Sequence, residues 1–183
     1  MFGARRRGRK QPFPEEWRGI IAARLAWWEH LDAEERSRLE RLVATFVASK
    51  RWEGVSGFEV GDEVKVVVAA HACMLILELV AAAYRRVGSI VVYRRPVVTR
   101  AVRSYGGGIV SDSPRPIHGE TRAGGPVVIT RSAVSADARR PELGRNVVYH
   151  EFAHQLDLLD GAADGEPPLR DPALRERWGG VVD

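Results

Sequence analysis

The stretch NVVYHEFAHQLDLLDG, residues 146–161, decides the fold of this chain because it predicts one amphipathic helix. Asn146 is a residue type that caps helix N-termini, and Gly161 stands where a glycine commonly follows a helix end. Apolar residues recur between them at helical spacing. We therefore expect a helix that starts after Asn146, ends before Gly161 and packs one face on a core; the apolar positions are Val147, Val148, Phe152, Leu156 and Leu159.

Two histidines and a glutamate on this helix indicate a metal site. His150 and His154 are four residues apart, so they lie about 40° from each other around the helix and about one turn apart along it. Two imidazoles so placed can bind one zinc ion, which in catalytic sites takes a third protein ligand and a water. Glu151 lies about 100° round from His150, beside the metal, where it can serve as general base on the zinc-activated water.

The H-E-x-x-H pattern thus predicts a zinc peptidase, with His150 and His154 as metal ligands and Glu151 as catalytic base. The alternative interpretation is a core helix with two incidental surface histidines. The capped ends and the apolar flanks favour the metal site.

Two aspartates follow the histidines on the same helix. Asp157 comes three residues after His154, and we expect it to orient a histidine ring or to pair with a cation, not to bind zinc. A plain structural role is the alternative. Asp160 has the spacing of a third ligand in some zinc peptidases, but those sites break the helix with a glycine where this chain has Asp157. We expect Asp160 to be an end-of-helix residue.

Three further helices are predicted upstream. The first covers residues 15–29, with acidic residues in its first turn. The second starts at Asp32, which forms a capping box with Glu35, and buries a stripe that runs from Leu39 to Val47. The third covers residues 62–84; its charged and polar residues argue against a membrane span, so we expect a buried helix with His71 as a hydrogen-bonded core residue.

Short β-branched segments between the helices predict a small sheet. They cover residues 89–93, 97–102 and 126–130, and glycine- and proline-rich turns separate them. The strand at 127–130 precedes the metal helix closely, so we expect it to lie near His150 and to pair with an extended peptide substrate. The fold class is therefore α+β, with helices packed on a small mixed sheet.

The basic character of the chain is confined to its start. Of the net charge of +4, five positive charges come from Arg5, Arg6, Arg7, Arg9 and Lys10, and without them the net charge becomes −1. We expect residues 1–14 to be a flexible solvated arm and expect no membrane partner. Contact of the arm with nucleic acid or acidic lipid is the alternative. Cys73 is the only cysteine, so no internal disulfide forms, and the start lacks a secretory signal pattern. A cytoplasmic location is expected.

Several segments resemble the Mlc titration factor A family of bacterial zinc-dependent peptidases. The most specific is VYHEFAHQLD at 148–157, followed by DGAA at 160–163 and GEPPL at 165–169. Weaker matches are EEW at 15–17, the connection at 49–57, ACMLIL at 72–77, SIVVY at 89–93 and GPVVI at 125–129. The resemblance implies a gluzincin-like catalytic domain, similar to that of anthrax lethal factor, with zinc as cofactor and aminopeptidase-type activity. It also implies that some members bind a glucose-responsive transcriptional repressor.

The chain departs from the family pattern after His154. In the family the third zinc ligand is a glutamate on a later helix, whereas here Glu166 lies in a Gly/Pro-rich loop and Glu176 in a short predicted helix at 172–178. Neither matches, so we expect residues 15–183 to form an incomplete zincin-like peptidase domain, truncated at its C-terminus, with the third ligand beyond residue 183. The competing hypotheses are a non-catalytic module that binds the repressor and a nucleic-acid-binding protein that uses the arm.

Overall fold

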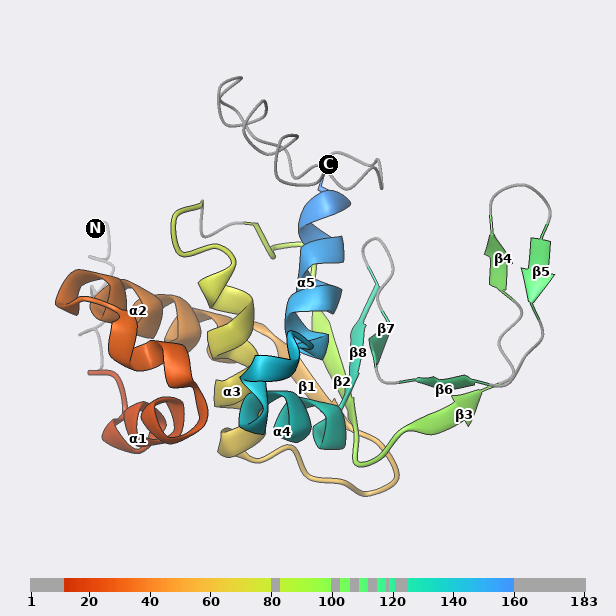
Figure 1. Ribbon diagram of the computed structural model, residues 1–183, viewed down its shortest axis with the longest axis horizontal. Coiled ribbons are helices and arrows are strands. Elements are labelled where there is room, and N and C mark those ends of the chain that lie inside the picture. Colours follow the sequence, from red (N-terminus) through yellow and green to blue (C-terminus); the bar gives the residue numbers. More distant parts are fainter. Residues whose placement is uncertain are drawn as a thin grey trace, which may run out of the picture.

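The computed structural model describes residues 12–79, 83–99, 103–105, 109–111, 115–117, 119–120 and 125–159. Within these residues the fold is α+β, as predicted. Helices gather on one face of a small sheet, and α5 stands against that face beside α3 (Figure 1). The helical elements are α1 (Glu15–Arg24), η1 (Ala26–His30), α2 (Ala33–Ser49), α3 (Asp62–Met74), α4 (Arg131–Arg139), η2 (Pro141–Leu143) and α5 (Val147–Asp157).

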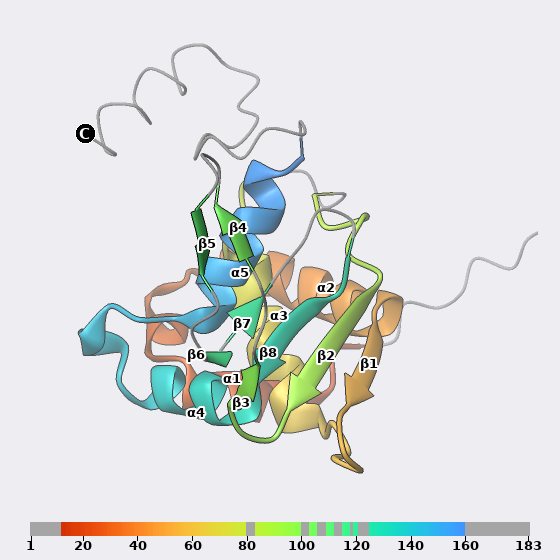
Figure 2. The same ribbon diagram turned by 90° about the vertical axis from the view of Figure 1, so that its right-hand side faces the viewer.

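The main sheet has the strand order β1-β2-β8-β7. Three of its strands run parallel, β1 (Arg51–Gly54), β2 (Ser89–Tyr93) and β8 (Val127–Thr130), and β7 (Gly119–Glu120) pairs with β8 in the antiparallel sense. The prediction of a mixed sheet is therefore confirmed, and Figure 2 shows the strands in front of the helices. Alternate residues of a strand point to opposite faces, and those facing the helices are fully buried: Ile90, Val92, Val127 and Ile129.

Two short antiparallel ribbons complete the described strands. β3 (Val97–Thr99) pairs with β6 (Arg115–Ile117), and β4 (Arg103–Tyr105) pairs with β5 (Ile109–Ser111). Both ribbons lie to one side of the helices (Figure 1).

The capping predictions for the second helix are confirmed. The Asp32 carboxylate accepts hydrogen bonds from the backbone N–H groups of Glu34 and Glu35, at 2.8 and 2.9 Å, and the Glu35 carboxylate accepts from the Asp32 N–H at 2.8 Å. Leu39, Val43 and Phe46 of the predicted stripe are buried in the core.

The other two upstream helices are shorter than predicted. The first ends at Arg24, where Leu25 turns extended and is itself buried, and a 3-10 turn follows that buries Trp28. The helix predicted at 62–84 ends at Met74, and turns follow that bury Ile76 and Leu77. The apolar run had suggested a longer helix because it contains no glycine or proline to mark the end.

The prediction that residues 127–130 pair with a substrate is wrong. β8 is an inner strand, hydrogen-bonded to β2 on one side and to β7 on the other, so its backbone is already paired in the sheet. It does pack against α5. The sequence analysis also missed β1 and α4.

Several predictions lie outside the described residues. They concern residues 1–11 of the arm, Asp160, Gly161, Glu166 and Glu176. None of the helices in the described ranges is long and apolar enough to cross a membrane.

Candidate metal centre

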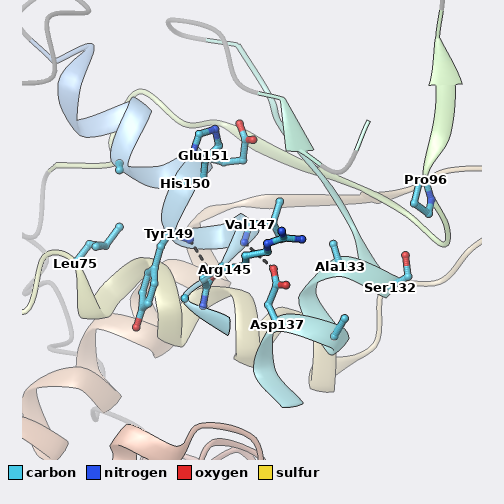
Figure 3. Close-up of a pocket in the computed structure, with 14 residues that line it drawn as sticks. Leu75, Pro96, Ser132, Ala133, Asp137, Arg145, Val147, Tyr149, His150 and Glu151 are labelled. Carbon is cyan, nitrogen blue, oxygen red and sulfur yellow. Dashed lines mark hydrogen bonds between the residues drawn. The ribbon is translucent and has the colours of Figure 1, made fainter. Parts of the chain in front are cut away.

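The start of α5 is held by two side-chain caps. The Asn146 Oδ1 atom accepts a hydrogen bond from the Tyr149 N–H at 3.0 Å, which confirms the predicted cap. The Asp137 Oδ2 atom, from α4, accepts from the Val147 N–H at 2.8 Å, and both bonds are drawn in Figure 3. Because the first N–H groups of a helix have no partner inside it, these caps fix where α5 begins.

Buried His71 holds the capping residue in turn. Its Nδ1 atom lies 3.2 Å from Asn146 Nδ2, and its ring packs edge-on against Tyr149, with the ring centroids 4.9 Å apart. The side chain is 5% exposed, and burial lowers its pKa to about 4. The neutral ring can accept the amide proton of Asn146, so His71 is the hydrogen-bonded core histidine that we predicted.

Inward residues of α5 anchor it in the core. Val148, Phe152 and Leu156 recur every four residues and are buried, and the Phe152 ring contacts those of Phe46 and Tyr84 at centroid distances of 5.5 and 5.0 Å. The described helix ends earlier than predicted, at Asp157. With this face in the core, the opposite face is exposed.

His150 and His154 lie on that exposed face. Their Nε2 atoms are 3.3 Å apart, and the ring centroids are 4.6 Å apart. Two nitrogens that bind one tetrahedral zinc ion, each at about 2.0–2.1 Å, are separated by roughly 3.3–3.4 Å. The pair therefore fits one zinc ion.

The protonation of His150 also suits a ligand. Partial burial, with a smaller contribution from His154, lowers the pKa of His150. A metal binds the neutral imidazole, so a lowered pKa keeps the ring in the binding form at neutral pH.

Glu151 is buried, at 4% exposure, and lines the same cleft as His150. The cleft has a volume of about 1020 Å³ and lies between α4 and α5, large enough for part of a peptide. Figure 3 shows the Glu151 carboxylate extending beside the His150 ring on the same side of the helix. A carboxylate so placed can exchange a proton with a water near the two imidazoles.

Among the described residues no group of three or more His, Cys, Asp or Glu side chains could hold a metal. Asp157 is partly exposed in the last turn of α5. The alternatives Asp160, Glu166 and Glu176 lie outside the described ranges.

Two residues of the cleft were missed by sequence reasoning. Asp137 comes ten residues before the N–H group that it caps, so no local pattern marks it. Arg145, the residue before Asn146, also lines the cleft. The sequence pattern that could have revealed it is a positively charged residue directly before a predicted helix cap.

The sequence matches the family described as glucose-regulated metallo-peptidase M90 over residues 2–183. The chain belongs to this metallopeptidase family. Its relatives include Mlc titration factor A of Salmonella typhimurium and of Salmonella enteritidis, each 30% identical over 164 residues and covering 87% of this chain. The resemblance to the Mlc titration factor A family is thereby confirmed.

An uncharacterized protein of Synechocystis sp. is 36% identical over 171 residues, which cover 92% of this chain. The matched regions cover 62% of that protein and 60% of the Salmonella factors. The chain therefore spans about 60% of the length of these curated relatives.

Proposed function

We propose that this chain carries the histidine pair and the general base of a zinc-dependent peptidase of aminopeptidase type, built on a zincin-like fold. The observation that carries the proposal is the 3.3 Å separation of the His150 and His154 Nε2 atoms, which suits one tetrahedral zinc ion. Membership of a metallopeptidase family supports it.

The proposed chemistry divides between the metal and the protein. A bound zinc ion would polarise the scissile carbonyl and lower the pKa of water. His150 and His154 would hold the zinc ion on the exposed face of α5. Glu151 takes a proton from the attacking water and returns it to the leaving amine, and its burial keeps bulk water away from the carboxylate. Asp157 is proposed to orient a histidine ring.

A zinc titration by calorimetry tests the ligands. The chain is expected to bind one zinc ion, and His150→Ala or His154→Ala should each weaken binding at least about tenfold. His30→Ala, an exposed histidine on η1, is the matched control and should bind zinc like the parent chain. Equal zinc binding by all four proteins would reject the site.

The role of Glu151 is tested on the complete gene product. Glu151→Gln should keep zinc bound and lower peptide hydrolysis by at least about a hundredfold, since the amide cannot take the proton. Loss of zinc together with activity would make the glutamate a ligand or a structural residue instead.

The third ligand can be sought among the remaining carboxylates. Asp160→Asn, Glu166→Gln and Glu176→Gln, each made in this chain, should leave zinc affinity unchanged if the ligand lies elsewhere in the protein. A variant that loses affinity as strongly as His150→Ala would identify the third ligand.

A second candidate function is a non-catalytic module that binds a transcriptional repressor. Two observations favour it: the relatives are named Mlc titration factor A, and the described residues offer the histidine pair no third ligand. The discriminating result is a Glu151→Gln protein that still binds the repressor, combined with a parent protein that hydrolyses no peptide.

A further inference from the structure

Arg145 lines the same cleft as His150 and Glu151 but has no part in the chemistry proposed above. It follows Gly144, whose φ of 63° is left-handed and turns the chain between η2 and α5. This turn delivers an exposed arginine to the mouth of the cleft. Figure 3 shows its guanidinium extended between the start of α5 and the Ala133 side of α4.

Among the described residues Arg145 forms no ion pair, whereas Arg18, Arg24 and Arg38 each pair with a glutamate elsewhere on the surface. Two carboxylates also line the cleft: Asp137 is hydrogen-bonded to a backbone N–H of α5, and Glu151 is buried. The positive end of the α5 dipole adds to the cationic character here.

The opposite wall of the cleft leaves room for a ligand beside the guanidinium. Ser132, Ala133 and Ala136 of α4 line it, and all three side chains are small. A guanidinium binds a carboxylate through two parallel N–H···O hydrogen bonds, which combine charge with a fixed orientation. A cation in a cleft without a charge partner is therefore matched by a carboxylate on whatever occupies the cleft.

We propose that Arg145 is a specificity-determining residue that binds a carboxylate of the peptide substrate. This inference rests on the proposed function for the choice of a peptide as the occupant. The carboxylate belongs either to an acidic side chain or to the C-terminus of the peptide.

Three sets of short alanine-based peptides separate these two sources. The first is amidated at its C-terminus and neutral, the second keeps the free C-terminal carboxylate, and the third is amidated and carries one glutamate at successive positions. On the complete gene product, Arg145→Gln should lower the kcat/KM ratio of carboxylate-bearing to neutral peptides by about tenfold to a hundredfold, mainly through KM. Arg145→Lys should lower this ratio less, because lysine keeps the positive charge but cannot form the two parallel hydrogen bonds of a guanidinium.

Arg139→Gln is the matched control, since Arg139 is also exposed, lies on α4 and does not line the cleft. It should leave the ratio unchanged. An equal fall with Arg139→Gln, or no fall with Arg145→Gln, overturns the inference while hydrolysis of the neutral peptides still upholds the peptidase function.

Binding of the same peptides to this chain, measured by calorimetry without turnover, keeps the two proposals separable. Arg145-dependent binding of carboxylate peptides by a protein that hydrolyses none of them supports the inference and rejects the peptidase function. Equal binding of neutral and carboxylate peptides overturns the inference.

Discussion

Asn146 uses both ends of its amide at the start of α5. Its Oδ1 atom accepts from the Tyr149 N–H, and its Nδ2 atom lies within hydrogen-bond distance of the His71 ring. The ring thus favours the amide orientation in which the oxygen faces the helix. His71 lies 75 residues earlier in the chain, so α5, which carries the histidine pair, is positioned from α3.

Loss of this cap should therefore weaken zinc binding as well as stability. Asn146→Ala is expected to lower the free energy of unfolding by about 1 kcal/mol and to reduce zinc affinity, measured by urea denaturation and calorimetry. Asp32→Ala removes the corresponding cap of α2 and should cost similar stability with unchanged zinc affinity. If both variants lost affinity alike, the effect would be general destabilisation.

The buried ring of His71 should make the fold sensitive to acid. Burial lowers its pKa from an ordinary value of 6.5 to about 4, so between these values the unfolded chain binds a proton that the folded chain does not. Stability is then full above about pH 6.5 and falls as the pH drops towards 4. The expected loss between pH 7 and pH 5 is on the order of 2 kcal/mol.

The check is the pH dependence of urea denaturation. His71→Phe keeps a ring in the core and should remove this part of the acid sensitivity, although it also loses the contact with Asn146. A variant whose stability fell as steeply between pH 7 and pH 5 as that of the parent would exclude His71 as the cause.

The cap and the buried histidine could each be predicted from the sequence, but not their contact. Asn146 stands before an apolar-periodic run, and His71 interrupts an otherwise apolar one, so local patterns reveal both. Their proximity depends on the packing of α3 against α5, for which no local pattern exists.

The stability of helix α5 depends on one aromatic side chain, Phe152, more than on any of its polar contacts. Phe152 is fully buried between Phe46 and Tyr84, two residues from each exposed histidine and on the opposite side of the helix. Phe152→Ala should cost about 3–5 kcal/mol in urea denaturation, through lost burial and the cavity left behind. The control is Ala153→Ser, which changes the next residue of α5, an exposed one. It should change the free energy of unfolding by less than about 0.5 kcal/mol. A Phe152→Ala cost as small as that would mean that α5 is not anchored here.

The elements that the sequence predicted well have clear start signals. Asp32 with Glu35 marks α2, Asn146 marks α5, and a short β-branched run marks β2. In contrast, β1 is a short edge strand with a polar sequence, and its pairing partner β2 lies far along the chain. α4 follows β8 without a break, and its one local signal was Thr130, whose hydroxyl caps the Ala133 N–H. Helix ends within long apolar runs carry no such signal.

Metal removal tests the molecule as a whole. The described core consists of apolar residues from α1 to α5 and the sheet, and α5 is capped and packed by side chains other than the two histidines. We expect chelation with EDTA to leave the far- and near-UV circular dichroism of the chain unchanged, unlike a zinc finger, which unfolds without metal. Loss of the near-UV signal on chelation would mean that the metal holds the fold together.

The contacts of α5 also determine when this helix can pack during protein synthesis. Its packing partners among the described elements include α2, α3, α4, β7 and β8, and all of these precede it in the chain. A ribosome that adds about 5–20 residues per second releases these elements before the two histidines emerge. The scaffold can thus begin to form first, and the imidazoles reach their 3.3 Å separation only when α5 docks on it.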